Sequence, residues 1–216
     1  MKRTLFVYLL LAVACTCAFA QNAGQGSGVI REFTGEVELK RAGASSFVPA
    51  KPGDTIAPDT IVSTGFKSAA VIQVGNSTIA VRALTRLSLA EIQSTSDTET
   101  LNVKLQTGRV KVDVKPPVGG KANCTVQGPS STASVRGTSF EIDAFSLKVL
   151  EGSVAFRGTR GRDILIPAGM TSTLDGEGRA VDPVGASVVT ASKSLKTPPS
   201  FEEPEVSLPG YIKIIE

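Results

Sequence analysis

Hydrophobic and polar residues alternate along most of the chain, from about residue 29 to residue 184. The alternation is clearest in the segments 101–106, 110–114 and 140–142, where Val, Leu, Ile or Phe takes every second position. A period of two places successive side chains on opposite faces of a strand, so each segment buries one face and leaves the other in water. Plentiful Thr, Val and Ile also suit a pleated surface. The pattern predicts an all-β protein.

Turn-forming residues interrupt this alternation at short intervals. Clusters of Gly, Pro, Asn and Asp fall at residues 51–54, 75–76, 116–120, 128–129 and 176–178. Many short strands separated in this way are typical of β-sandwiches, barrels and solenoids. We expect a twisted β-sandwich or a β-helix-like coil of short strands, with little helix.

A recurrent motif places a Gly two residues before a Val and four before a large apolar residue. It begins at Gly35, Gly108 and Gly152, and a longer relative begins at Gly137. Each Gly precedes an expected strand, where the chain turns with a positive φ or approaches other atoms closely. Around Gly108 the apolar phase shifts by one residue, which one straight strand does not allow. We therefore expect a corner or a bulge at that point.

The first twenty residues have the pattern of a secretory signal peptide. Lys2 and Arg3 form a basic start, the run Leu5–Ala14 is apolar, and Ala18–Ala20 fits the small-residue rule for signal peptidase. We expect cleavage after Ala20 and export to the periplasm or the cell surface. A run of ten residues is short for a membrane-spanning helix, which needs about 20.

Two alternatives to simple cleavage remain open, an uncleaved anchor and a lipid on Cys15. Bacterial lipid-attachment sites usually carry Leu three residues before the Cys, and this sequence has Ala12 there.

Cleavage after Ala20 also removes Cys15 and Cys17, so Cys124 would stand alone and form no intramolecular disulfide. We expect Cys124 to be a small buried side chain.

The expected organisation has four parts. After the signal peptide, residues 21–28 form a flexible N-terminus and residues 29–184 form the β domain. Residues 185–216 form a C-terminal extension with a Pro-rich linker. Within that extension, residues 187–195 have helical spacing and residues 210–215 read as a short strand.

Composition excludes several classes of function. The 23 Lys and Arg nearly balance the 20 Asp and Glu, so no broad positive field favours nucleic acid. The chain has no His, which excludes an imidazole base and a Ser-His-Asp triad. No phosphate-binding loop or metal-ligand cluster is found, and few aromatic residues disfavour a sugar-stacking platform. We expect no enzyme activity, no cofactor and no metal.

Two charged groupings have a functional and a simpler interpretation. Glu141 and Asp143 share one strand face, as paired carboxylates for glycoside cleavage would, but a solvated strand face shows the same pattern. Lys and Arg residues crowd two neighbouring segments, either as a basic strip for an anionic surface or as a solvated face. These basic residues are Lys104, Arg109, Lys111 and Lys115.

Five segments resemble the FecR domain in their order and spacing. The specific part is VRGTSFEI at residues 135–142 followed by VLEGSVAF at residues 149–156. The segments FTGEVELKRAG, GDTIAPDTIVSTG and LQTGRVKVDV, which begin at residues 33, 53 and 105, are more generic β sequence. The resemblance covers about residues 29–168.

The resemblance implies an all-β, non-enzymatic domain. In the family's founding role, a membrane sensor with a cytoplasmic anti-sigma segment, one membrane span and a periplasmic FecR domain relays a transporter signal to a sigma factor. Here the apolar segment starts at residue 5, so we expect no cytoplasmic part and no membrane span after cleavage. The chain resembles exported stand-alone FecR-domain proteins.

The motif residues are interpreted as structural. We expect Arg136 to pack at a sheet corner, paired with Glu151 or Asp143, because a buried guanidinium needs a partner. The full set of motif residues is Gly35, Gly108, Arg136, Gly137, Thr138, Phe140, Glu151 and Gly152.

Two functions from different classes follow. The first is an exported module that binds an envelope protein, peptide or glycan. The second is a structural or accessory component of an envelope assembly. A third reading, a β-solenoid enzyme acting on polysaccharide, needs a convergent acid–base pair that the sequence does not display.

Overall fold

The computed structural model describes residues 26–95 and 97–185. Within these ranges the chain forms strands and turns, and no helix. The all-β prediction is confirmed. The predicted signal peptide, the lipidation alternative at Cys15, the short helix at 187–195, the Pro-rich linker and the terminal strand all lie outside the described residues. No helix in the described part has the length and hydrophobicity needed to cross a membrane.

The strands form two sheets of nine strands each, which we call sheet 1 and sheet 2. Sheet 1 has the order β18 (Val184–Gly185), β17 (Met170–Thr173), β14 (Ser146–Glu151), β13 (Ser139–Asp143), β10 (Arg109–Asp113), β7 (Ser77–Val81), β6 (Ala69–Val74), β1 (Gly28–Thr34), β4 (Thr55–Ile56). Sheet 2 has the order β16 (Ile164–Pro167), β15 (Ser153–Gly158), β12 (Ser131–Val135), β11 (Lys121–Gln127), β9 (Thr98–Thr107), β8 (Arg86–Ser94), β5 (Ile61–Thr64), β2 (Val37–Lys40), β3 (Val48–Pro49).

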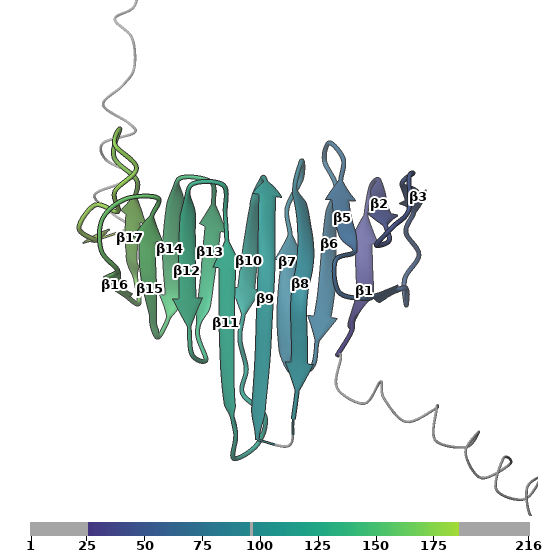
Figure 1. Cartoon of the computed structure of the whole chain (residues 1–216), viewed down its shortest axis with the longest axis horizontal. Coiled ribbons are helices and arrows are strands. Elements are labelled where there is room, and N and C mark those ends of the chain that lie inside the picture. Colours follow the sequence, from purple (N-terminus) through teal and green to yellow (C-terminus); the bar gives the residue numbers. More distant parts are fainter. Residues whose placement is uncertain (1–25, 96, 186–216) are drawn as a thin grey trace, which may run out of the picture.

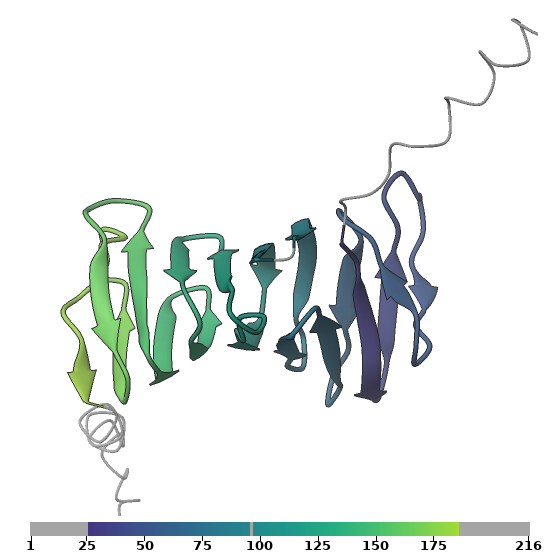
Figure 2. The same ribbon diagram turned by 90° about the horizontal axis from the view of Figure 1, so that it is seen from below.

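The chain passes back and forth between the two sheets as it runs from one end of the sandwich to the other. Early strands such as β1, β2 and β6 lie at one end, and β14 to β17 lie at the other (Figures 1 and 2). Strands β9 and β11 pair in parallel in sheet 2. The strand that lies between them in the sequence, β10, belongs to sheet 1. The other ladders between named strands are antiparallel. The fold therefore combines a sandwich with one coil-like step.

The core lies between the two sheets and follows the alternation of the sequence. Along β6 and β10, every second side chain is buried. The largest fully buried side chains are Phe140 of sheet 1 and Phe156 of sheet 2. Each large apolar side chain buried in this way stabilises the fold by about 1.5–3 kcal/mol. The predicted burial of Cys124 is also confirmed.

The four motif glycines occupy the corners at which the chain passes from one sheet to the other. Their φ values are 74° at Gly35, 89° at Gly108, 66° at Gly137 and 74° at Gly152. Gly108 separates β9 of sheet 2 from β10 of sheet 1, which explains the shift of apolar phase in the sequence. The predicted corners are confirmed, and they serve to change sheets.

Gly108→Ala is expected to destabilise the fold by about 2–4 kcal/mol, through a strained φ and a backbone clash. A Cβ at this position would lie 2.5 Å from the Cα of Thr85. Gly43→Ala is the matched control, because Gly43 also has a positive φ but a Cβ there would meet nothing within 4 Å. It should cost only about 1 kcal/mol. Urea unfolding measures both, and equal losses would contradict the corner argument.

Candidate functional site

The structure divides the motif residues between two opposite edges of the sandwich. Gly35 and Gly108 lie at one long edge, whereas Gly137 and Gly152 lie at the other. At that second edge Gly152 packs closely against Thr138 of the motif. A Cβ on Gly152 would lie 2.6 Å from Cγ2 of Thr138. Phe140 is a core residue of β13. These positions fit a structural role for the motif.

The expected packing of Arg136 is wrong. Arg136 follows the buried Val135 at the end of β12 and is therefore exposed. Among the described residues its guanidinium forms no ion pair with Glu151 or Asp143. Asp143 lies at the opposite end of β13 from this corner and is paired with Arg109. Strand alternation thus places the guanidinium in solvent.

Hydroxyl groups hold the edge that carries Gly35 and Gly108. The backbone N–H of Glu36 donates to Ser68 Oγ at 2.8 Å, and that of Arg109 donates to Thr85 Oγ1 at 3.0 Å. The N–H of Thr85 donates in turn to Thr64 Oγ1 at 3.0 Å. These buried or part-buried hydrogen bonds tie successive corners together and fix the turns beside them.

Three turns of this edge carry exposed apolar side chains. The exposed fractions are 73% for Phe66, 60% for Leu84 and 64% for Phe145. The turns are neighbours, because the N–H of Leu84 donates to the carbonyl of Gly65 at 3.2 Å and Arg109 pairs with Asp143 beside Phe145. We call this edge the turn edge; it comprises Gly35, Gly108 and the turns 65–68, 82–85 and 144–145.

The backbone of two turn-edge residues is unusual. Lys67 and Leu84 have φ values of 53° and 55°, in the left-handed region that favours Gly. A bulky residue there costs about 1 kcal/mol or more. Since Leu84 is exposed, burial of its side chain does not offset this strain. Lys67 places its ammonium 5.6 Å from the centre of the Phe66 ring.

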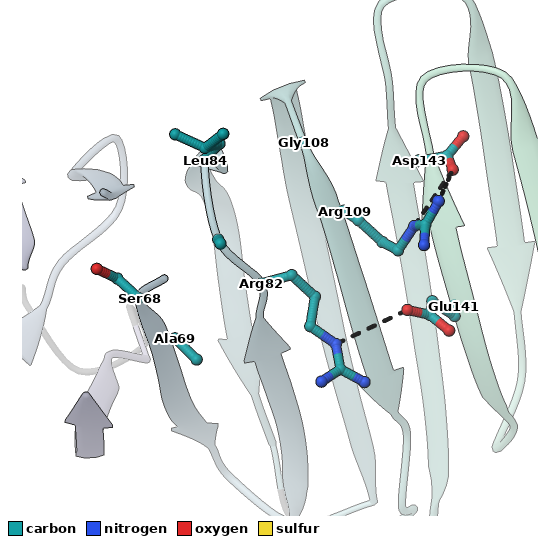
Figure 3. Close-up of a pocket in the computed structure, with 9 residues that line it drawn as sticks. Ser68, Ala69, Arg82, Leu84, Gly108, Arg109, Glu141 and Asp143 are labelled. Carbon is teal, nitrogen blue, oxygen red and sulfur yellow. Dashed lines mark hydrogen bonds and ion pairs between the residues drawn. The ribbon is translucent and has the colours of Figure 1, made fainter. Parts of the chain in front are cut away.

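An open groove of about 730 Å³ runs beside Leu84 on the outer face of sheet 1. It crosses the ends of β6, β7, β10 and β13 (Figure 3). Small residues leave this space free, namely Ser68, Ala69, Ala83 and Gly108.

Two ion pairs form the charged side of the groove. Arg82 Nε lies 3.8 Å from Glu141 Oε1, and Arg109 Nη2 lies 2.8 Å from Asp143 Oδ2. Figure 3 shows each guanidinium pointing toward its carboxylate. Arg109 and Asp143 lie on the neighbouring strands β10 and β13, whereas Arg82 follows β7 and its pair with Glu141 reaches over β10. Each of the two carboxylates that share a strand face thus lies beside a separate arginine. This arrangement favours charge pairing over the acid–base roles considered for Glu141 and Asp143.

Asp143 is the best-anchored group in the groove. It accepts hydrogen bonds from the N–H of Phe145 at 2.9 Å, the N–H of Ser146 at 2.8 Å and the hydroxyl of Ser146 at 2.9 Å. Partial burial raises the pKa of Asp143, but these bonds and the Arg109 guanidinium outweigh it and hold the pKa below its ordinary value. The carboxylate therefore fixes both Arg109 and the turn that presents Phe145.

Asp143→Asn should lower the free energy of unfolding by about 1–2 kcal/mol at neutral pH. Because the folded-state pKa is depressed, the contribution of Asp143 is fully present above the unfolded pKa of about 3.9 and is lost as pH falls through the folded pKa. Urea unfolding at several pH values should show the two proteins converging in acid. A difference that stays constant down to pH about 2 would contradict this assignment.

The basic strip considered from the sequence is not continuous. Lys104 lies on β9 in sheet 2, whereas Arg109 and Lys111 lie on β10 in sheet 1. Arg109 is paired with Asp143, and Lys115 lies 3.3 Å from Asp113. Because the chain changes sheet at Gly108, residues that are close in sequence face opposite sides of the sandwich.

A buried polar cluster links the sheets away from the groove. The Glu99 carboxylate accepts a hydrogen bond from Ser77 Oγ at 2.9 Å and one from the N–H of Asn76 at 3.2 Å. Burial, and secondarily the charge of Glu99, raise the pKa of the Cys124 thiol to about 12. Cys124 is therefore an unreactive core thiol.

Cys124 in the folded protein should resist a thiol reagent at pH about 8, because its thiolate is scarcely populated and its side chain is buried. Modification should be slow in buffer and complete in denaturant, measured by Ellman's assay on protein that lacks residues 1–20. Rapid modification of the folded protein would contradict the assignment.

Several residues of the turn edge and of the groove carry no motif in the sequence. Phe66, Leu84 and Phe145 read as ordinary apolar residues, and Arg82 as a solvated charge. A weak signal was present, since Phe66 and Leu84 stand beside turn residues and outside the strand alternation. The pairing of Arg82 with Glu141 and of Arg109 with Asp143 depends on strand order, which the sequence does not display.

Two nine-stranded sheets joined at glycine corners define an all-β sandwich domain with an open charged groove on one sheet. The family model described as FecR protein matches residues 60–155. This part of the chain therefore matches the FecR family, which is the family that its motifs resemble. All residues that line the groove lie within the matched range.

Two solved structures are similar to part of the chain. Both are crystal structures of a candidate anti-sigma factor from Parabacteroides distasonis ATCC 8503, at 17% identity and a TM-score of 0.47. The similarity covers 62% of this chain and 64% of that chain in one, and 61% and 62% in the other. The chain thus spans less than two thirds of those proteins. No curated protein matches it.

Proposed function

We propose that this protein is an exported, non-catalytic β-scaffold that binds a protein of the cell envelope at its turn-edge groove. Export is supported by the signal-peptide pattern of residues 1–20. The FecR family supports a non-catalytic role, since its domains act as sensors that recognise other molecules.

The observation that carries the proposal is the geometry of Leu84. Its backbone is strained and its side chain is exposed, so neither local conformation nor core packing accounts for it. Strain and apolar exposure at one residue are typical of a binding surface. Phe66 and Phe145 extend the apolar surface along the same edge. A bound protein would bury all three side chains.

The groove suits a protein better than a small molecule. It is open, and each of its carboxylates lies beside an arginine. Exposed aromatic residues and Arg are enriched where proteins meet. The turns that present these side chains are held by the hydrogen bonds of Ser68, Thr85 and Asp143, so the surface is preorganised.

A photoreactive amino acid placed at Leu84 should cross-link one discrete partner in intact cells. The control position is Val118, which is fully exposed in a loop at the opposite edge and should give no such adduct. An adduct of equal yield from both positions, or none from Leu84, would contradict the proposal. A stoichiometric adduct that high salt and competitor leave unchanged would favour the accessory role in a fixed assembly.

A further inference from the structure

The two arginines of the groove are held very differently. Arg109 donates to Asp143 Oδ2 through Nη2 at 2.8 Å and through Nε at 3.3 Å. Arg82 contacts Glu141 only through Nε, at 3.8 Å, which is beyond hydrogen-bond distance. Arg109 is therefore fixed, and Arg82 is free to turn toward another acceptor.

Glu141 does not depend on Arg82 for its charge balance. In the ladders of sheet 1, Glu141 lies opposite Lys111 on β10 and opposite Lys148 on β14. Directly opposed residues of opposite charge attract one another across a sheet. Loss of Arg82 would thus leave Glu141 between two cations, so the cost of exchanging Arg82 to a new partner is small.

The groups that face outward from the groove are cationic. The side chains of Arg82 and Arg109 are 56% and 55% exposed, whereas those of Glu141 and Asp143 are 25% and 20% exposed. The carboxylates are recessed and the guanidinium groups stand above them. A molecule that approaches the groove therefore meets positive charge first, although the pairs are neutral in sum.

Apolar side chains border this cationic surface. Leu84, Ala69 and Ala83 line the groove beside Arg82. Phe66 lies one turn away, with the Lys67 ammonium above its ring. A ligand that fits both features carries carboxylates and apolar side chains together, which is the chemistry of an acidic protein segment.

We propose that the groove binds an acidic, partly apolar segment of another protein, and that Arg82 exchanges Glu141 for a carboxylate of that segment. Leu84 and the neighbouring aromatic tips pack against the apolar side chains of the segment. This inference rests on the proposed function, and it names the chemistry of the partner and the residue that selects it.

The test uses short labelled peptides and fluorescence anisotropy at low salt. One peptide alternates leucine with aspartate, a second has asparagine in place of aspartate, and a third has lysine. The wild-type protein should bind the aspartate peptide about five- to tenfold more tightly than the asparagine peptide, and the lysine peptide least. Arg82→Gln should remove the preference for aspartate over asparagine.

Arg157→Gln is the matched control for this substitution. Arg157 is also half-exposed and pairs loosely with Asp163 at 3.5 Å, but it lies on β15 in sheet 2. It should leave the preference unchanged. Because Arg82 is half-exposed, Arg82→Gln should also keep the wild-type melting temperature, so lost selectivity would not reflect unfolding.

The outcomes separate the two proposals. Leu84→Ser should weaken both the aspartate and the asparagine peptide. If it does so while Arg82→Gln changes neither affinity, the binding groove stands and the proposed exchange of Arg82 is wrong. If neither substitution alters binding, both proposals are wrong. Failure of the wild-type protein to bind the aspartate peptide, or equal affinity for all three peptides, also overturns the inference.

Discussion

The fold depends on sharp passages between two sheets at glycine corners. At Gly35, Gly108 and Gly152 the chain leaves one sheet and enters the other through a residue with positive φ, packed against a Ser or Thr of the adjacent corner. A side chain at such a point would meet Ser68, Thr85 or Thr138. The absence of a Cβ therefore lets the sheets stack closely, and the buried alternation of each strand follows from that stacking.

The same passages create the surface on which function is proposed. Because β9 and β10 belong to different sheets, Arg109 emerges at the turn edge beside Asp143. The hydroxyl of Thr85 accepts the N–H of Arg109 and so links the Leu84 turn to the Gly108 corner. The groove thus results from the change of sheet at the glycine corners, and the hydrogen bonds at those corners keep it rigid.

Local pattern predicted the strands, the corners and the family, because period-two alternation and positive-φ glycines are properties of neighbouring residues. The motif predicts a buried and paired Arg136. The side chain is exposed because it follows the buried Val135 and strand alternation points it outward. Lys104 and Lys111 seemed adjacent until the sheet change at Gly108 separated them. The ion pair of Arg82 with Glu141 depends on the order β13, β10, β7, which is a long-range property.

The central claim is that the turn-edge groove, and no other surface of the sandwich, is where a partner binds. Amide hydrogen exchange of the full chain, measured with and without the leucine–aspartate peptide, tests it most directly. The account predicts slower exchange confined to the turns 65–68, 82–85 and 144–145. Protection that appears instead on the outer face of sheet 2, or on the edge strand β16, would contradict it.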